Sequence, residues 1–198
     1  MNSNRRAEIR DEVAAHAEEV FAGVESRWDD VPRLEPLTVE PLPDDEASFP
    51  ESDDEFFDRF YPYAAGAAVT DDEGRLLCVY SPVRDEWETP GGAGESGERP
   101  AETACRETRE ETGVECELTG VLQTRLMELD LGEPELLPIP VVEFTGRVAG
   151  GEELAGDEID AHGGVSDLDW FGPDELPSHV REYEQKVAHL RSLDRREK

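Results

Sequence analysis

Residues 91–114, GGAGESGERPAETACRETREETGV, join a glycine-rich loop to a segment dense in carboxylates. If the second half is a helix, Glu107, Glu110 and Glu111 lie at i, i+3 and i+4, and their side chains leave one face. Three such carboxylates repel one another. A hard divalent cation, which prefers oxygen ligands, would turn that repulsion into coordination. The stretch therefore predicts a cation site on a helix.

The limits of this helix are marked by residues with fixed preferences. Pro100 suits a first helical position and Gly113 suits a helix end, so we expect a helix from about Pro100 to Thr112. Its inward stripe is expected to be Ala101, Ala104, Cys105 and Thr108, with the glutamates on another side.

Two simpler interpretations compete with the cation site. Gly92, Gly94 and Gly97 match a dinucleotide-binding fingerprint, but Glu95 and Glu98 would bring negative charge to the place where pyrophosphate binds. In a chain with 50 acidic residues, spaced glutamates also arise as an ordinary hydrated helix surface. The spacing of the glycine, arginine and glutamate residues across the whole of residues 87–114 distinguishes these interpretations.

That spacing resembles the Nudix box. The matching positions are Gly92, Glu98, Arg106–Glu107, Glu110–Glu111 and Gly113–Val114, preceded by the lead-in Trp87-Glu88-Thr89-Pro90-Gly91. Thr108 departs from the pattern, because the family usually has an aliphatic residue there. A threonine methyl group can still pack inward if its hydroxyl bonds back along the helix.

The resemblance implies a hydrolase that cleaves a nucleoside diphosphate linked to another moiety, with an α/β fold of the Nudix α/β/α sandwich type around a mixed sheet. It implies Mg²⁺, or Mn²⁺ in its place, because the substrate pyrophosphate and the glutamates are both anionic. By position, the metal ligands are Glu98, Glu107, Glu110 and Glu111. Arg106 resembles the family's orienting arginine, with Glu110 as its partner one turn on; Gly92 and Gly113 shape the loop and the helix end.

The general base and the phosphate contacts are less closely defined. Glu110 or Glu111 are candidates for the base. Arg84 and Arg125 are the basic residues expected to contact phosphate. Further candidates for the base are the acids of the loop that follows the strand near residue 139: Glu152, Glu153, Asp157 and Glu158.

The composition sets limits on partners and surroundings. The formal net charge is −31, and the only lysines are Lys186 and Lys198. An acidic, lysine-poor surface suits concentrated salt, where screening suppresses self-repulsion. It offers no basic stripe for a nucleic-acid backbone or an anionic membrane.

The sequence also favours a cytoplasmic location. No apolar run approaches membrane-spanning length, and the amino terminus lacks an export segment. Cys78, Cys105 and Cys116 have no CxxC spacing, so reduced thiols are expected rather than a disulfide framework or a zinc site.

The chain is expected to comprise an extension, residues 1–59, and a hydrolase domain, residues 60–198, that includes a C-terminal helix. Residues 5–28 have helical apolar spacing, and this helix is expected to pack on the domain or on a second copy of the chain, which would make a homodimer. A proline- and acid-rich connector with little helix follows.

Several further elements are expected in the second part. Phe56, Phe57, Phe60, Tyr61 and Tyr63 are interpreted as core-filling residues that begin the globular part. Strands are predicted over residues 63–69, 75–80, 118–129, 139–148 and 165–171, and a final helix is predicted to begin at Pro173.

The resemblance leaves the substrate and two other kinds of function open. Asp130 stands where the ADP-ribose subgroup has a proline, and no tyrosine between Val114 and Trp170 supports the dinucleoside-polyphosphate subgroup. A nucleotide sensor that does not hydrolyse is the alternative, although such modules commonly lose metal-binding glutamates that this chain keeps. The extension could also make the protein an interaction subunit.

Overall fold

The computed structural model describes residues 1–41, 48–151 and 164–193. The elements are α1 (Ser3–Glu25), β1 (Leu37–Val39), α2 (Asp53–Phe60), β2 (Ala64–Thr70), β3 (Leu76–Ser81), β4 (Glu86–Glu88), β5 (Gly91–Ala93), α3 (Pro100–Thr112), β6 (Val114–Leu129), β7 (Leu137–Gly151), β8 (Asp167–Phe171) and α5 (Tyr183–Leu193). The sheet has the strand order β1-β6-β7-β2-β3-β4, while β5 pairs with β2 and β8 with β3. The pairs β1–β6 and β2–β7 are parallel and the other pairs are antiparallel, so the sheet is mixed.

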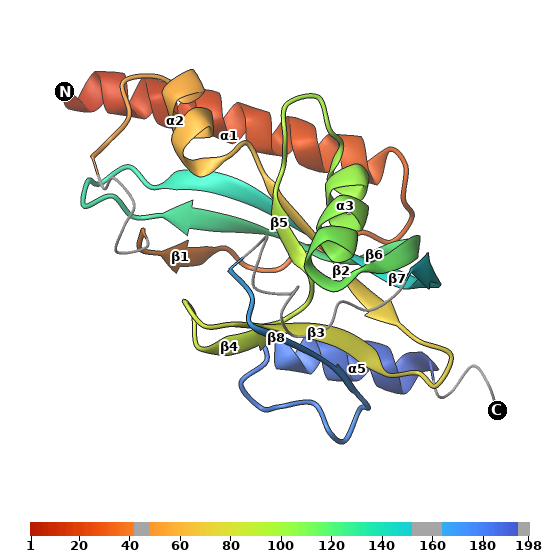
Figure 1. Cartoon of the computed structure of the whole chain (residues 1–198). Coiled ribbons are helices and arrows are strands. Elements are labelled where there is room, and N and C mark those ends of the chain that lie inside the picture. The colour runs from red at the N-terminus through yellow and green to blue at the C-terminus, as the bar shows by residue number, and fades with distance from the viewer. Residues whose placement is uncertain (42–47, 152–163, 194–198) are drawn as a thin grey trace.

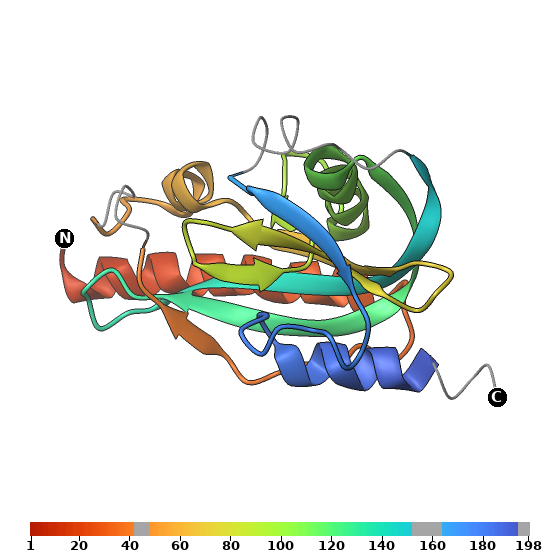
Figure 2. The ribbon, with the colours of Figure 1, turned by 60° about the horizontal axis from the view of Figure 1, so that its bottom comes forward.

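Alternate residues of the central strands face different helices. Ala67 and Phe144, which are register partners on β2 and β7, share a core with α1 and α3. Ala68 points to the other side and packs with Val187 and Leu190 of α5. Figures 1 and 2 show α1 and α3 on one side of the sheet and α5 on the other. The predicted sandwich of helices around a mixed sheet is confirmed.

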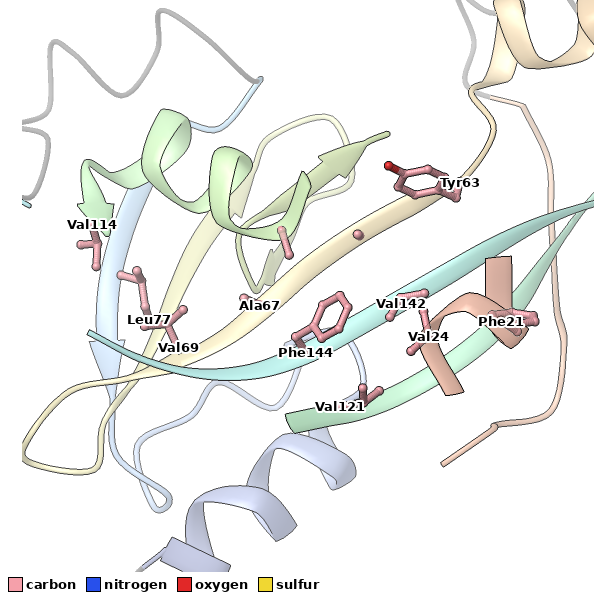
Figure 3. Close-up of a cluster of buried hydrophobic side chains, with 12 residues drawn as sticks. Phe21, Val24, Tyr63, Ala67, Val69, Leu77, Val114, Val121, Val142 and Phe144 are labelled. Atoms are coloured by element: carbon pink, nitrogen blue, oxygen red, sulfur yellow. The ribbon is translucent and has the colours of Figure 1, made fainter. Parts of the chain in front are cut away.

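The N-terminal helix α1 packs on the sheet of its own chain. Its buried stripe includes Phe21 and Val24, which lie against Val142 of β7 in the core cluster that Figure 3 shows. Helix α1 begins after Asn2, whose side chain accepts a hydrogen bond from the backbone N–H of Arg5. Among the described residues, no helix has the length and apolar character needed to cross a membrane.

The connector contains more regular structure than expected. Leu37–Val39 pairs in parallel with the end of β6, and Asp53–Phe60 forms α2. Ser52 caps this helix by accepting the backbone N–H of Glu55, and three acids occupy its first turn, where the helix dipole favours negative charge. Phe56 and Phe60 are buried, as their interpretation as core residues requires.

The predicted strands are confirmed, but the start of the final helix is wrong. Helix α5 begins at Tyr183, ten residues after Pro173. The intervening segment makes short turns, in which Leu176 bonds back to Gly172 and Val180 to Pro177. Pro177 has no N–H to donate, so a continuous helix across it would lose a backbone bond.

Candidate active site

Helix α3 has the limits that its sequence predicts. Pro100 is its first residue, Arg99 is the N-cap, and the side chain of Glu102 accepts the Arg99 backbone N–H at 2.9 Å. Gly113 ends the helix in the left-handed conformation, with φ of 74°. On the buried side, the Thr108 hydroxyl donates to the carbonyl of Ala104 at 2.7 Å. The threonine is thus accommodated as proposed.

Carboxylates of the loop and helix converge on Arg106. Its Nε lies 2.9 Å from Oε1 of Glu98, and its Nη1 lies 2.7 Å from Oε1 of Glu107 and 3.0 Å from Oε2 of Glu110. The predicted pair between Arg106 and Glu110 is therefore present. The guanidinium hydrogen bonds lower the pKa of Glu98 and, in return, raise the pKa of Arg106.

The glycine loop lies directly on these side chains. A β-carbon on Gly92 would lie 2.6 Å from Cδ of Glu107, and one on Gly94 would overlap the ring of Tyr63. A side chain at Gly92 would force the loop away from α3, and one at Gly94 would force it away from Tyr63. Glycine is thus required here for close approach rather than for an unusual backbone angle.

The Tyr63 hydroxyl holds the end of the glycine loop by hydrogen bonding. It donates to the Glu98 carbonyl at 2.9 Å and lies 3.0 Å from the Thr103 hydroxyl. Thr103 in turn donates to Oε2 of Glu98 at 2.8 Å. Sequence reasoning assigned Tyr63 to the core and did not find this role, because the contact joins the start of β2 to a loop 35 residues later.

The glutamates of α3 differ strongly in exposure. The Glu110 side chain is 44% exposed, whereas Glu111 is 5% exposed and its Oε2 accepts the backbone N–H of Gly91 at 3.0 Å. Burial, reinforced by the nearby Glu107 carboxylate, raises the pKa of Glu111 to about 8. Burial also raises the pKa of Glu107. The glutamate side of α3 therefore combines a buried carboxylate, Glu111, with a solvent-exposed one, Glu110.

The two arginines singled out for phosphate binding lie in different surroundings. Arg84 pairs with Glu88 at 3.1 Å and lies close enough to Glu111 to oppose the rise of its pKa. Arg125 pairs instead with Glu182 at 3.1 Å. The loop acids Glu152, Glu153, Asp157 and Glu158 lie outside the described residues.

A second polar cluster lies on the sheet face that α5 covers, and sequence reasoning missed it. Nζ of Lys186, which is 1% exposed, lies 2.9 Å from Oε1 of Glu143. The Thr89 hydroxyl donates to the same oxygen at 2.6 Å, and Gln123 donates to Oε2 at 2.7 Å. Although burial opposes it, the Lys186 charge lowers the pKa of Glu143 to about 2. Thr89 lies just before the glycine loop, so its hydrogen bond to Glu143 ties the start of that loop to β7.

The donors of the α3 site fit a hard divalent cation by their chemistry. Glu98, Glu107 and Glu110 offer only carboxylate oxygens, which Mg²⁺ and Mn²⁺ prefer. In the part of the chain that the structure describes, no group of three or more His, Cys, Asp and Glu side chains is arranged so that it could hold a metal ion as it stands. The Arg106 guanidinium stands among the carboxylates instead, so a cation would have to compete with it.

The chain is similar to known proteins over most of its length. The family model described as NUDIX domain matches residues 60–191. A "MutT-like protein" of Streptomyces ambofaciens is 32% identical over 133 residues, which cover 66% of this chain and 73% of that protein. An "RNA pyrophosphohydrolase" of Erythrobacter litoralis is 29% identical over 145 residues, covering 66% and 87%.

Solved structures share the fold. The crystal structure of a hydrolase of the NUDIX family from Clostridium perfringens superposes with a TM-score of 0.51 at 18% identity. The match covers 67% of this chain and 95% of that one. At this identity the likeness concerns the arrangement of helices and strands alone.

Proposed function

Because the chain belongs to the Nudix hydrolase family, we propose that it cleaves the pyrophosphate bond of a nucleoside diphosphate linked to another moiety, with a divalent cation. The observation that carries this proposal is the convergence of Glu98, Glu107 and Glu110 on Arg106 beneath the glycine loop. Burial raises the pKa of the neighbouring Glu111, and a bound cation would favour release of its proton and give the carboxylate a charge partner.

The proposed ligands of Mg²⁺, or of Mn²⁺, are Glu98, Glu107, Glu110 and Glu111. When bound, such a cation neutralises phosphate oxygens and makes a water molecule more acidic. Arg106 holds the carboxylates together before the substrate arrives. Its ion pairs with three of them hold charges close together that would otherwise repel each other.

We assign the acceptance of the water proton to Glu110. Of the two candidates on α3, Glu110 is the exposed one, so water can reach its carboxylate. Glu111 is buried and already accepts the Gly91 N–H. The acids Glu152, Glu153, Asp157 and Glu158 are the alternative, and a loop variant that abolishes turnover would favour them.

Arg84 is the proposed phosphate contact. Its side chain is 39% exposed, and its ion pair with Glu88 keeps it near the α3 carboxylates. A guanidinium can hold phosphate oxygens with two parallel hydrogen bonds. Arg125 is a weaker choice because its side chain is only 20% exposed, against 39% for Arg84.

The test is a screen of nucleoside diphosphate and triphosphate derivatives with the full chain in high salt. Nucleoside monophosphate is counted by anion-exchange chromatography, with Mg²⁺, with Mn²⁺ and with a chelator. We expect product from at least one compound with either cation and none with chelator. If no compound is hydrolysed while nucleotides still bind, the protein is a sensor instead. We place the activity in the cytoplasm, where such nucleotides are made.

A further inference from the structure

Two thiols face each other where α3 packs on β6. Sγ of Cys116 lies 3.6 Å from Sγ of Cys105, and the Cys105 thiol also approaches the Cys116 carbonyl at 3.8 Å. Both residues are partly exposed and both carry free thiols. A disulfide has its sulfur atoms about 2.05 Å apart, so the two sulfurs need to move closer by about 1.5 Å for the bond to form.

We propose that Cys105 and Cys116 form a reversible disulfide when the protein meets a peroxide. The third thiol provides an internal contrast. Cys78 is fully buried in the core, and burial raises its pKa to about 12. A reagent in solution can thus reach the pair but not Cys78.

The oxidation balances with hydrogen peroxide as the oxidant. One cysteine loses its thiol proton and the resulting thiolate attacks a peroxide oxygen. The O–O bond breaks, the leaving hydroxide takes up that proton, and a sulfenic acid and one water form. The second thiol then attacks the sulfenic sulfur, and a second water leaves as the S–S bond forms. Two electrons have passed from the two sulfurs to one peroxide, and a dithiol reductant restores both thiols by exchange.

The position of this bond gives it a consequence for the active site. The crosslink would close a ring that runs from Cys105 through the helix end at Gly113 to Cys116. A short crosslinked ring limits local opening of the segment inside it. The residues enclosed by the ring include Arg106, Glu107, Glu110 and Glu111. The inference rests on the sulfur geometry and stands whether or not the proposed hydrolysis is right.

Peptide mapping tests the proposal directly. Trypsin cuts after Arg106 and Arg109, so the two cysteines fall on separate peptides unless a disulfide joins them. The full chain is treated with hydrogen peroxide, alkylated and digested without reductant. We expect a linked pair of peptides, lighter than the sum of the two by two hydrogens, in the wild type and in Cys78→Ser. Cys105→Ser and Cys116→Ser should lack it, and dithiothreitol should restore two alkylated thiols.

Thermal unfolding of the full chain provides a second readout. The oxidised chain should melt at least about 3 °C above the reduced chain in the same salt, because the crosslink restricts the unfolded state. Cys105→Ser should show no such difference. The proposal is overturned if both thiols remain alkylatable after peroxide, if they oxidise separately to sulfinic acids, or if oxidation leaves the melting temperature unchanged.

Discussion

The α-carbon of Gly92 lies so close over the Glu107 carboxylate that a β-carbon there would be 2.6 Å from Cδ and 2.7 Å from Oε1. We predict that Gly92→Ala lowers turnover at least about 10-fold, because the methyl group displaces a proposed metal ligand from its working position. Circular dichroism should show a folded protein. Gly23→Ala is the matched control, because Gly23 lies on α1 and a β-carbon there would be 3.8 Å from Nη1 of Arg27, an ordinary contact. This variant should leave turnover unchanged. Wild-type turnover in Gly92→Ala would show that the contact is unimportant.

The ion pair between Lys186 and Glu143 predicts a large effect on stability. Lys186→Met leaves a carboxylate buried without its charge partner, which costs about 3–5 kcal/mol in the free energy of unfolding. Adding Glu143→Gln removes that charge and should recover part of the loss. Arg147→Met breaks an exposed pair with Glu117 and should change stability by less than about 1 kcal/mol. Urea denaturation at constant salt measures all four proteins. Equal losses for the exposed and the buried pair would contradict the assignment.

Glu182 makes stability depend on pH. Burial, together with repulsion from Glu143 and against the attraction of Lys186 and Arg125, raises its pKa to about 7. The folded protein therefore retains a proton that the unfolded chain releases near pH 4.5, and this contribution to stability is lost as the pH rises from about 4.5 to 7.

The variant Glu182→Gln isolates this effect from the many other acids. Its free energy of unfolding relative to the wild type should rise between pH 5 and pH 8, by an amount on the order of 2 kcal/mol. The exposed neighbour Glu184 provides the control variant Glu184→Gln, whose difference from the wild type should stay flat. A flat difference for Glu182→Gln as well would place Glu182 in solvent.

The net charge of −31 predicts dependence on salt. At about 1 M salt the Debye length is about 3 Å, so repulsion across the surface is screened. Removing salt should therefore lower the melting temperature and the helical circular dichroism signal. The change should follow ionic strength and be similar for KCl and NaCl. Unchanged melting in dilute buffer would refute adaptation to salt.

Local patterns predicted the parts of the molecule that depend on local chemistry. Pro100 and Gly113 predicted the limits of α3, and the i, i+4 spacing predicted the pair between Arg106 and Glu110. Helix α2 was not predicted, because its phenylalanines were interpreted only as core residues. The cap at Ser52, followed by three acids, was the signal that could have identified it.

Contacts between distant segments could not be predicted in this way. The burial of Glu111 depends on β5 placing the Gly91 N–H over it. The pair of Glu143 with Lys186 depends on the register of β7 and on where α5 begins. No spacing along the chain encodes either contact, because each arises only when the sheet and the helices pack together.

The most direct test of the central claim compares the wild type with Glu110→Gln, on whichever nucleotide the screen finds to be hydrolysed, at saturating Mg²⁺ in high salt. The substitution removes one charge at nearly constant shape, and Glu115→Gln on the neighbouring strand β6 is the control. The account predicts that the turnover number of Glu110→Gln falls at least about 100-fold, while Glu115→Gln keeps the wild-type rate. A folded Glu110→Gln protein with wild-type turnover would contradict the role assigned to the α3 carboxylates.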